Sequence, residues 1–379
     1  MLAQAVREKF AKDASNEIIL TDITGKKVGG EEIASNGNTE VDSLFLDITD
    51  FENVKNVFNE VRPALVINCA AYTAVDKAET QEGLAYKINA DGPGNLARAC
   101  VELGKTEEWR RMAEDGEVPE GGPVLVHIST DYVFGGSKPA SEEYSEDDEK
   151  KPETAYGRTK LAGEEQIEES GCNYYIFRTA WLYGHGGKNF VETMLSVART
   201  SSLADARFTR RTGSTARSSA PAASNSIATE STATPSSSHS IPAESIAPAA
   251  SNSIAAESIV RVVADQHGSP TYTEDLTDII YQAVTKHISY GIYNATDLGY
   301  TTWAGFTEKI YEFAKINCQV QGISSAEYEA QAKAKAGEDY KVAKRPLNSK
   351  MSKRKLLDAG VKIPTWEDGL KRYLKKEGV

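Results

Sequence analysis

The chain has 379 residues, a formal net charge of −12 at pH 7 and a pI of about 5.1. This length allows a large α/β domain with a smaller one, and the acidic balance argues against nucleic acid or an anionic membrane as the main partner. The four cysteines and five histidines show no metal-ligand spacing, so we expect neither a metal site nor a disulfide framework.

Short apolar segments alternate with helical patterns through the first half of the chain. The helical patterns cover residues 51–60, 78–103 and 155–169. Nearly continuous apolar runs are typical of strands covered on both faces, and they occupy residues 16–22, 43–48, 64–71, 123–130 and 173–179. The alternation predicts an α/β fold with a doubly wound parallel sheet of the Rossmann type.

Composition divides the rest of the chain. Residues 203–258 are nearly all Ser, Ala, Thr and Pro and contain a repeated APAASNSIA segment, so we predict a low-complexity disordered insertion there. Residues 105–122 are predicted to be a surface excursion outside the core. Beyond the insertion, a strand at 259–264 and helices at 274–287 and 303–316 predict a smaller lobe. The predicted units are therefore a dinucleotide-binding domain at 1–202, the insertion, and a substrate-binding lobe at 259–379.

The first residues, MLAQAVREKF, have the pattern of the first helix of such a sheet. A dinucleotide-binding sheet opens with a strand and a G-x-x-G-x-x-G/A turn, whose amides bind the pyrophosphate. Ala3 fits the last small position of that turn. We therefore expect the first strand and the glycine loop to be missing from this sequence, and this chain to bind NADH poorly or not at all.

Two motifs carry the candidate chemistry. In YGRTK (156–160), Tyr156 and Lys160 are one helical turn apart and share a face, where a lysine charge lowers the tyrosine pKa from about 10. In HISTDYVFGG (127–136), Thr130 ends a strand at the edge where ligands bind. Together they predict hydroxyl donors for a carbonyl oxygen. A simple Ser/Thr-Asp turn and a solvated Tyr/Lys pair are the alternatives.

The ordered motifs resemble the extended short-chain dehydrogenase/reductases and, within them, the dTDP-4-dehydrorhamnose reductases. The resemblance runs in order along the chain, through NCAAYTAVDKAE (68–79), INADGPGNLA (88–97), STDYVFGG (129–136), YGRTKLAGE (156–164), RTAWLYG (178–184), GSPTYTEDL (268–276) and RPLNS (345–349). It implies hydride transfer from NADH or NADPH to the 4-keto group of dTDP-4-dehydro-L-rhamnose, which forms dTDP-L-rhamnose.

The resemblance also implies roles for single residues. The catalytic set is Thr130, Tyr156 and Lys160, and the substrate-binding set adds Asp131, Trp181 and Arg345. For Trp181 a core position is the competing explanation, and for Arg345 a solvated charge.

Cofactor contacts are expected to follow the strand ends. Asp22 can accept from an adenosine ribose hydroxyl and repel a 2′-phosphate, which favours NADH over NADPH. For Asp47, capping of the following helix is the alternative. Tyr156 and Lys160 belong to this set too, and its other members are Asp47, Ile48, Ala71, Tyr72, Thr73 and Asn89.

Two other functions stay open at this stage. One is a non-catalytic binding subunit similar to the regulatory subunit of methionine adenosyltransferase, which would not need the Thr-Tyr-Lys set. The other is a reductase or epimerase for a different sugar nucleotide. The sequence has no 18-residue apolar run and no signal peptide, so we expect a cytoplasmic protein with a sugar-nucleotide ligand and no membrane partner. Homodimer formation is left open.

Overall fold

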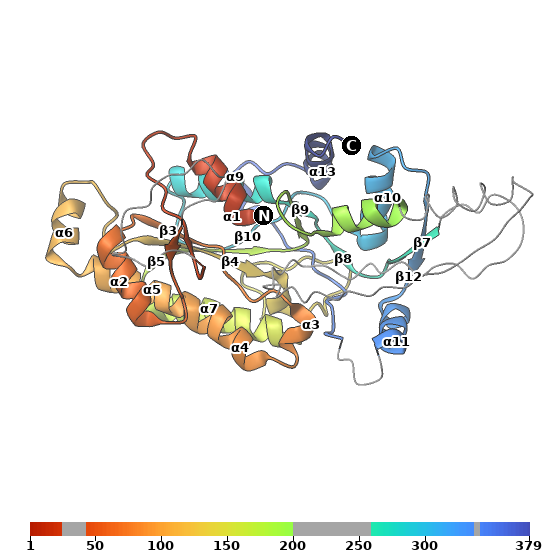
Figure 1. Ribbon diagram of the computed structural model, residues 1–379, viewed down its shortest axis with the longest axis horizontal. Helices are drawn as coiled ribbons and strands as arrows, with labels where there is room; N and C mark the ends of the chain where they lie inside the picture. Colours follow the sequence, from red (N-terminus) through yellow and green to blue (C-terminus); the bar gives the residue numbers. More distant parts are fainter. Residues whose placement is uncertain (25–42, 200–258, 337–341) are drawn as a thin grey trace, which may run out of the picture.

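The computed structural model describes residues 1–24, 43–199, 259–336 and 342–379. A central parallel sheet lies between two layers of helices, and a second group of strands and helices lies beside it (Figure 1). The predicted low-complexity insertion at residues 203–258 lies outside the described residues. Among the described helices, none combines the length and apolar character needed to cross a bilayer.

The sheet has four parallel strands in the order β10-β5-β4-β3. Their bounds are β3 Leu65–Asn68, β4 Val124–Thr130, β5 Asn173–Thr179 and β10 Gly291–Asn294. A separate parallel pair joins β1 (Thr21–Asp22) to β2 (Leu44–Phe45). The five strands predicted in the first half are confirmed; β5 has the predicted bounds and the other four are shorter.

Helices cover both faces of the sheet, as Figure 1 shows. On one face α1 (Leu2–Phe10) packs on α9 (Thr273–Thr285). On the other face α5 (Gly92–Gly104) lies between α2 (Phe51–Val61) and α7 (Ala155–Ser170). Their apolar side chains form separate clusters on the two faces. The predicted doubly wound arrangement is therefore confirmed.

The helical pattern predicted at residues 78–103 is interrupted in the structure. It contains α3 (Val75–Ala78), α4 (Glu82–Tyr86), a π-helical turn (Lys87–Asp91) and then α5. At the π turn, the backbone oxygen of Asn89 lies only 2.1 Å from where a Cβ on Gly163 would be. Glycine at that position of α7 is what lets the two segments approach so closely.

The excursion at residues 105–122 was predicted to lie outside the core, and this is wrong for one side chain. It forms α6 (Glu107–Glu114), capped by Thr106, and Trp109 is buried in the cluster that contains Leu103 and Phe58. The indole Nε1 donates to the oxygen of Pro119 at 2.9 Å. An indole that finds a polar partner can be buried at low cost, so a mostly charged helix is anchored by one aromatic residue.

Residues from 259 onward contribute both to the sheet and to the second group. α9 and β10 belong to the sheet layers, whereas β7 (Ile259–Val263) pairs in parallel with β12 (Gln319–Ile323). α10 (Trp303–Phe313) packs on that pair. The remaining elements are β6 Leu182–Tyr183, β8 His267–Gly268, β9 Thr271–Tyr272, β11 Thr301–Thr302, α11 Ser325–Ala336, α12 Arg354–Asp358 and α13 Trp366–Lys376.

A buried carboxyl group in this second group lacks a complete set of partners. Asp297 accepts from the Tyr272 N–H at 3.1 Å through Oδ2, but its Oδ1 has no hydrogen bond within the described part of the chain. Burial raises the pKa of Asp297 well above its usual value, and the nearby Asp275 adds to the effect. The neutral acid is therefore favoured in the folded protein.

Asp297→Asn is expected to stabilise the protein at alkaline pH. A raised folded-state pKa stabilises the fold fully below the unfolded pKa of about 3.8 and loses that stabilisation as pH rises through the folded value. The amide removes this ionisation and keeps an oxygen for Tyr272. We expect the melting temperature at pH 8 to rise by about 2 °C or more, with a smaller change at pH 5. An equal shift at both pH values would show that Asp297 does not titrate in this way.

Candidate active site

The carboxyl end of β4 provides the first candidate side chain. Thr130 is buried, ends the strand, and accepts from the Tyr132 N–H at 3.3 Å, which caps the 3-10 turn Asp131–Phe134. Its hydroxyl lies 3.0 Å from Asp131 Oδ1. Because the strand alternates its faces and ends here, the hydroxyl and the carboxylate emerge at the edge of the sheet where ligands bind.

Tyr156 reaches the same edge from the first turn of α7. Thr154 caps this helix by accepting from the Gly157 N–H at 3.0 Å, which sets where the helix begins. The buried Tyr156 ring packs edge-on against Tyr132, with ring centroids 5.4 Å apart. Its hydroxyl hydrogen-bonds with Thr130. The structure thus brings together the two hydroxyls that the sequence predicted.

The pKa of Tyr156 departs from its predicted direction. Burial raises this pKa, the hydrogen bond with Thr130 opposes the rise, and the Asp131 charge adds to it. The expected lowering by Lys160 is therefore wrong for this arrangement. Lys160, one turn later on α7, instead donates to the Ile128 oxygen at 2.6 Å, and its Nζ lies 3.0 Å from His127 Nε2.

A buried ion pair supports this end of α7. The Arg178 guanidinium on β5 binds both carboxylate oxygens of Glu164, with Nη2 to Oε2 at 2.7 Å. Ser129 donates to the same carboxylate from β4. Both charged side chains are almost completely buried, at 0% and 1% exposure. The pair therefore fixes α7 against the two central strands, one turn from Lys160.

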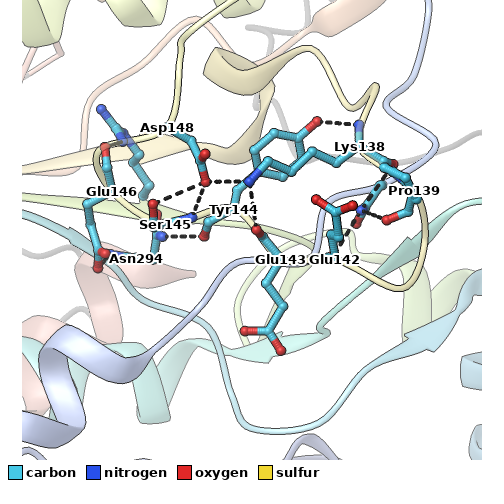
Figure 2. Close-up of polar contacts among 11 residues, drawn as sticks. Lys138, Pro139, Glu142, Glu143, Tyr144, Ser145, Glu146, Asp148 and Asn294 are labelled. Atoms are coloured by element: carbon cyan, nitrogen blue, oxygen red, sulfur yellow. Dashed lines mark hydrogen bonds and ion pairs between the residues drawn. The ribbon is translucent and has the colours of Figure 1, made fainter.

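An acidic loop, residues 138–148, follows the 3-10 turn after β4, and Lys138 binds several of its oxygen atoms, as Figure 2 shows. Lys138 Nζ binds Asp148 Oδ2 at 2.7 Å and the Glu143 oxygen at 3.0 Å. Asn294 on β10 donates to the Tyr144 oxygen at 2.9 Å, which fixes the loop to the sheet. The Tyr144 ring stacks on Phe134, 4.7 Å away, so the loop supports the turn that carries Asp131.

The predicted substrate residues make contacts within the protein. Ser349, from the RPLNS motif, donates to Asp131 Oδ2. Arg345 binds both carboxylate oxygens of Asp76, with Nη2 to Oδ2 at 2.9 Å. This pairing replaces the solvated charge considered for Arg345. The C-terminal motif thus reaches the β4 end of the sheet.

Trp181 lies between the sheet and the second group of elements. Its ring is 8% exposed and stacks on Trp303 at a centroid distance of 3.8 Å. Its backbone φ is +50°, an uncommon left-handed value for tryptophan that indicates a constrained position. The contacts of Trp181 are therefore those of a core residue. Stacking of Trp181 on a ligand stays a prediction.

Cofactor candidates follow the ends of β1, β2 and β3, as expected for parallel strands. Asp22 is exposed and accepts from the Thr24 N–H and hydroxyl at 2.9 and 2.6 Å. Asp47 binds the Thr49 N–H at 2.9 Å, whereas Asp50 caps α2, so the capping role considered for Asp47 belongs to Asp50. Ile48 is half-buried.

The loop after β3 is held by Asn89. The amide of this buried residue accepts from the Tyr72 N–H at 2.8 Å and donates to the Tyr72 oxygen at 3.0 Å. It also donates to Thr159 on α7 at 3.1 Å. Asn89 therefore positions the loop of Ala71, Tyr72 and Thr73, whose residues are all half-buried. Asp22 and Asp47 lie at or just after the ends of β1 and β2, and the Ala71–Thr73 loop follows β3.

Two polar residues at the site were not predicted. His127 and Asn68 are both buried, and they join Lys160 to the sheet through His127. The sequence signal was a histidine inside the apolar run VLVHIST, beside a neighbouring strand that ends in asparagine. Metal-ligand spacing was the wrong test for this histidine, because its partners are an amide and an amine.

Comparison with known proteins identifies relatives over most of the chain. The sequence profile described as the RmlD substrate binding domain matches residues 24–106, 110–232 and 250–379. The spore coat polysaccharide biosynthesis protein SpsK of Bacillus subtilis is 30% identical over 353 residues, covering 93% of this chain and 90% of the relative. The dTDP-4-dehydrorhamnose reductase of Streptomyces griseus is 36% identical over 266 residues, covering 68% and 62%.

Solved structures of proteins with the same name as the second of these relatives also match the fold of this chain. A dTDP-4-dehydrorhamnose reductase from Clostridium acetobutylicum matches with 31% identity and a TM-score of 0.63, covering 90% of this chain and 92% of the other. The enzyme of the same name from Bacillus anthracis, in complex with NADP, matches with 31% identity and a TM-score of 0.61, covering 88% and 89%. The chain therefore belongs to the RmlD substrate binding domain family.

Proposed function

We propose that the protein is an NAD(P)H-dependent reductase that converts dTDP-4-dehydro-L-rhamnose to dTDP-L-rhamnose. The observation that carries this proposal is the buried meeting of Thr130 with Tyr156, beside Lys160, at the carboxyl end of the sheet. Several relatives bear the reductase name, and one neighbour holds NADP. A non-catalytic binding subunit would not need this set of side chains.

The residues divide the chemistry as follows. A bound reduced nicotinamide supplies the hydride to C4 of the sugar. Tyr156 donates its proton to the carbonyl oxygen as that oxygen becomes an alcohol, and Thr130 donates a hydrogen bond to the same oxygen. Burial makes both hydrogen bonds stronger than they would be in water. Lys160 would hold the nicotinamide ribose and, from that position, would return a proton to Tyr156.

The remaining contacts orient the two ligands. Asp22 would accept from a hydroxyl of the adenosine ribose, Asp47 and Ile48 would border the adenine, and the loop Ala71–Thr73 would follow the cofactor backbone. Asp131 and Trp181 contact the sugar nucleotide. Arg345 faces its pyrophosphate once the pair with Asp76 is exchanged, since a guanidinium binds either oxyanion in the same geometry.

Reductase activity is tested with the purified protein and dTDP-4-dehydro-L-rhamnose. NADH and NADPH are each titrated to saturation while loss of reduced nicotinamide absorbance is recorded. We expect a higher kcat/KM with NADH than with NADPH, because the Asp22 carboxylate repels a 2′-phosphate. No sugar-dependent oxidation of either cofactor would remove the reductase assignment. A higher kcat/KM with NADPH would remove the NADH preference alone.

A further inference from the structure

Three buried polar side chains from different elements form a hydrogen-bonded series that ends at Lys160 of the candidate active site. Asn68 and His127 are direct neighbours in the pairing of β3 with β4, and Asn68 Nδ2 lies 3.1 Å from His127 Nδ1. Lys160 Nζ on α7 lies 3.0 Å from the other ring nitrogen, Nε2. The three side chains are 5%, 0% and 1% exposed, so water does not compete for these contacts.

The backbone determines which way the Asn68 amide faces. The Ala70 N–H donates to Asn68 Oδ1 at 3.0 Å. The opposite orientation would place the amide NH₂ against this N–H, with two donors facing each other. The NH₂ group of Asn68 is therefore the part that faces His127, and it can only donate.

This orientation fixes the proton positions along the hydrogen-bonded series of Asn68, His127 and Lys160. His127 Nδ1 must accept from Asn68, so a neutral imidazole carries its proton on Nε2. That proton faces Lys160 Nζ, and only a neutral amine has the lone pair to accept it. The amine keeps a hydrogen for the Ile128 oxygen at 2.6 Å. An ammonium at this position would instead point one of its own N–H groups at the imidazole N–H, so that two donors would face each other.

The surroundings of Lys160 make its neutral amine easier to form than that of a lysine in water. Glu164, one turn later on α7, is already bound by Arg178 from β5 and by Ser129 from β4. Burial lowers the pKa of Lys160 to about 8, and the Glu164 charge only partly opposes this. Burial is the main cause that lowers the pKa of His127, and this disfavours an imidazolium as the alternative.

We propose that Asn68 and His127 are positioning residues that stabilise the neutral amine of Lys160 and so let Lys160 give up its proton during turnover. The catalytic part of this inference rests on the proposed function. An ammonium that restores the Tyr156 proton becomes an amine, and the imidazole N–H then donates a hydrogen bond to the lone pair of that amine. A proton donor works best when its pKa lies near the working pH.

The proton positions can be measured without any substrate. In protein labelled with ¹⁵N-histidine, long-range ¹H–¹⁵N spectra distinguish the two tautomers, and loss of one signal in His127→Gln assigns the residue. Above the Lys160 pKa of about 8, where the amine predominates, we expect the wild-type His127 ring to be protonated at Nε2. Protonation at Nδ1 in the wild type would overturn the proposal before any variant is tested.

The variant Asn68→Asp should reverse the imidazole tautomer of His127. A carboxylate accepts from both the Ala70 N–H and the imidazole, so the proton should move to Nδ1 and leave the Nε2 lone pair facing Lys160. Lys160 should then be held as an ammonium. Its titration, followed through the Cε signal of labelled lysine and assigned with Lys160→Arg, should rise by about one pH unit or more, a tenfold change in the protonation constant. Asn59→Asp makes the same charge change at an exposed residue of α2 and should leave the Lys160 titration unchanged.

Activity then tests the consequence for the reaction. The alkaline limb of kcat/KM should move upward in Asn68→Asp together with the Lys160 titration, while Asn59→Asp keeps the wild-type profile. An unchanged Lys160 titration in Asn68→Asp would overturn the proposal. Because tautomer and titration are measured without substrate, they stand or fall separately from the assignment as a reductase.

Discussion

Replacing Tyr156 with phenylalanine is expected to lower kcat by at least about two orders of magnitude, as for loss of a positioned general acid. The substitution removes only the hydroxyl that hydrogen-bonds with Thr130 and leaves the ring packed against Tyr132. The neighbouring Thr130 hydroxyl cannot take over, because an alcohol is a much weaker acid than a phenol. Stopped-flow recording of nicotinamide oxidation at saturating substrate measures the loss directly.

Tyr183→Phe is the matched control for this experiment. Tyr183 is also a fully buried tyrosine, and its hydroxyl has no hydrogen-bond partner among the described residues. Its loss should leave kcat within about a factor of two. Near-normal turnover in Tyr156→Phe would remove Tyr156 from the mechanism, whereas an equal loss in both variants would point to general damage of the fold.

The largest effect on stability is expected from Glu164→Gln. The neutral amide leaves the Arg178 guanidinium buried without its counter-charge, and breaking a buried pair in this way costs about 3–5 kcal/mol. Denaturant unfolding at pH 7 measures the change in the free energy of unfolding. The amide keeps one oxygen acceptor where the carboxylate had two, so the contacts of β4 and β5 with α7 are weakened as well.

A surface pair of the same chemistry provides the comparison. Arg158 on α7 binds Glu82 with Nε to Oε1 at 2.8 Å, and both side chains are nearly half exposed. Glu82→Gln should therefore cost no more than about 1 kcal/mol, since water screens the charges and solvates them when they separate. Equal costs for Glu82→Gln and Glu164→Gln would contradict the claim that burial makes the Glu164 pair important.

The alternation of strands and helices was predictable because burial on two faces leaves a strong pattern. The π turn at Lys87–Asp91 was not, since apolar spacing continues through it and only the contact of Asn89 with Gly163 requires it. Trp109 was missed for a similar reason. One buried aromatic residue anchors a helix whose other residues are mostly charged and give no sign of burial.

Within the site, spacing predicted that Tyr156 and Lys160 share a face of one helix. It did not reveal which strand residues face them. His127 and Asn68 meet Lys160 only because β3 and β4 pair in one register, and that register depends on contacts far apart in the sequence. The predicted lowering of the Tyr156 pKa failed for the same reason, because it assumed an ammonium directed at the phenol.

The placement of β10 in the sheet has a consequence for synthesis on the ribosome. β5 ends at Thr179, but the strand that covers its edge begins only at Gly291, which is 291 − 179 = 112 residues later. At about 5–20 residues per second, translation of that interval takes roughly 6 to 22 s. Throughout that time the nascent chain exposes an unpaired strand edge, which other nascent chains can join. The interval sets how long a chaperone must shield this edge.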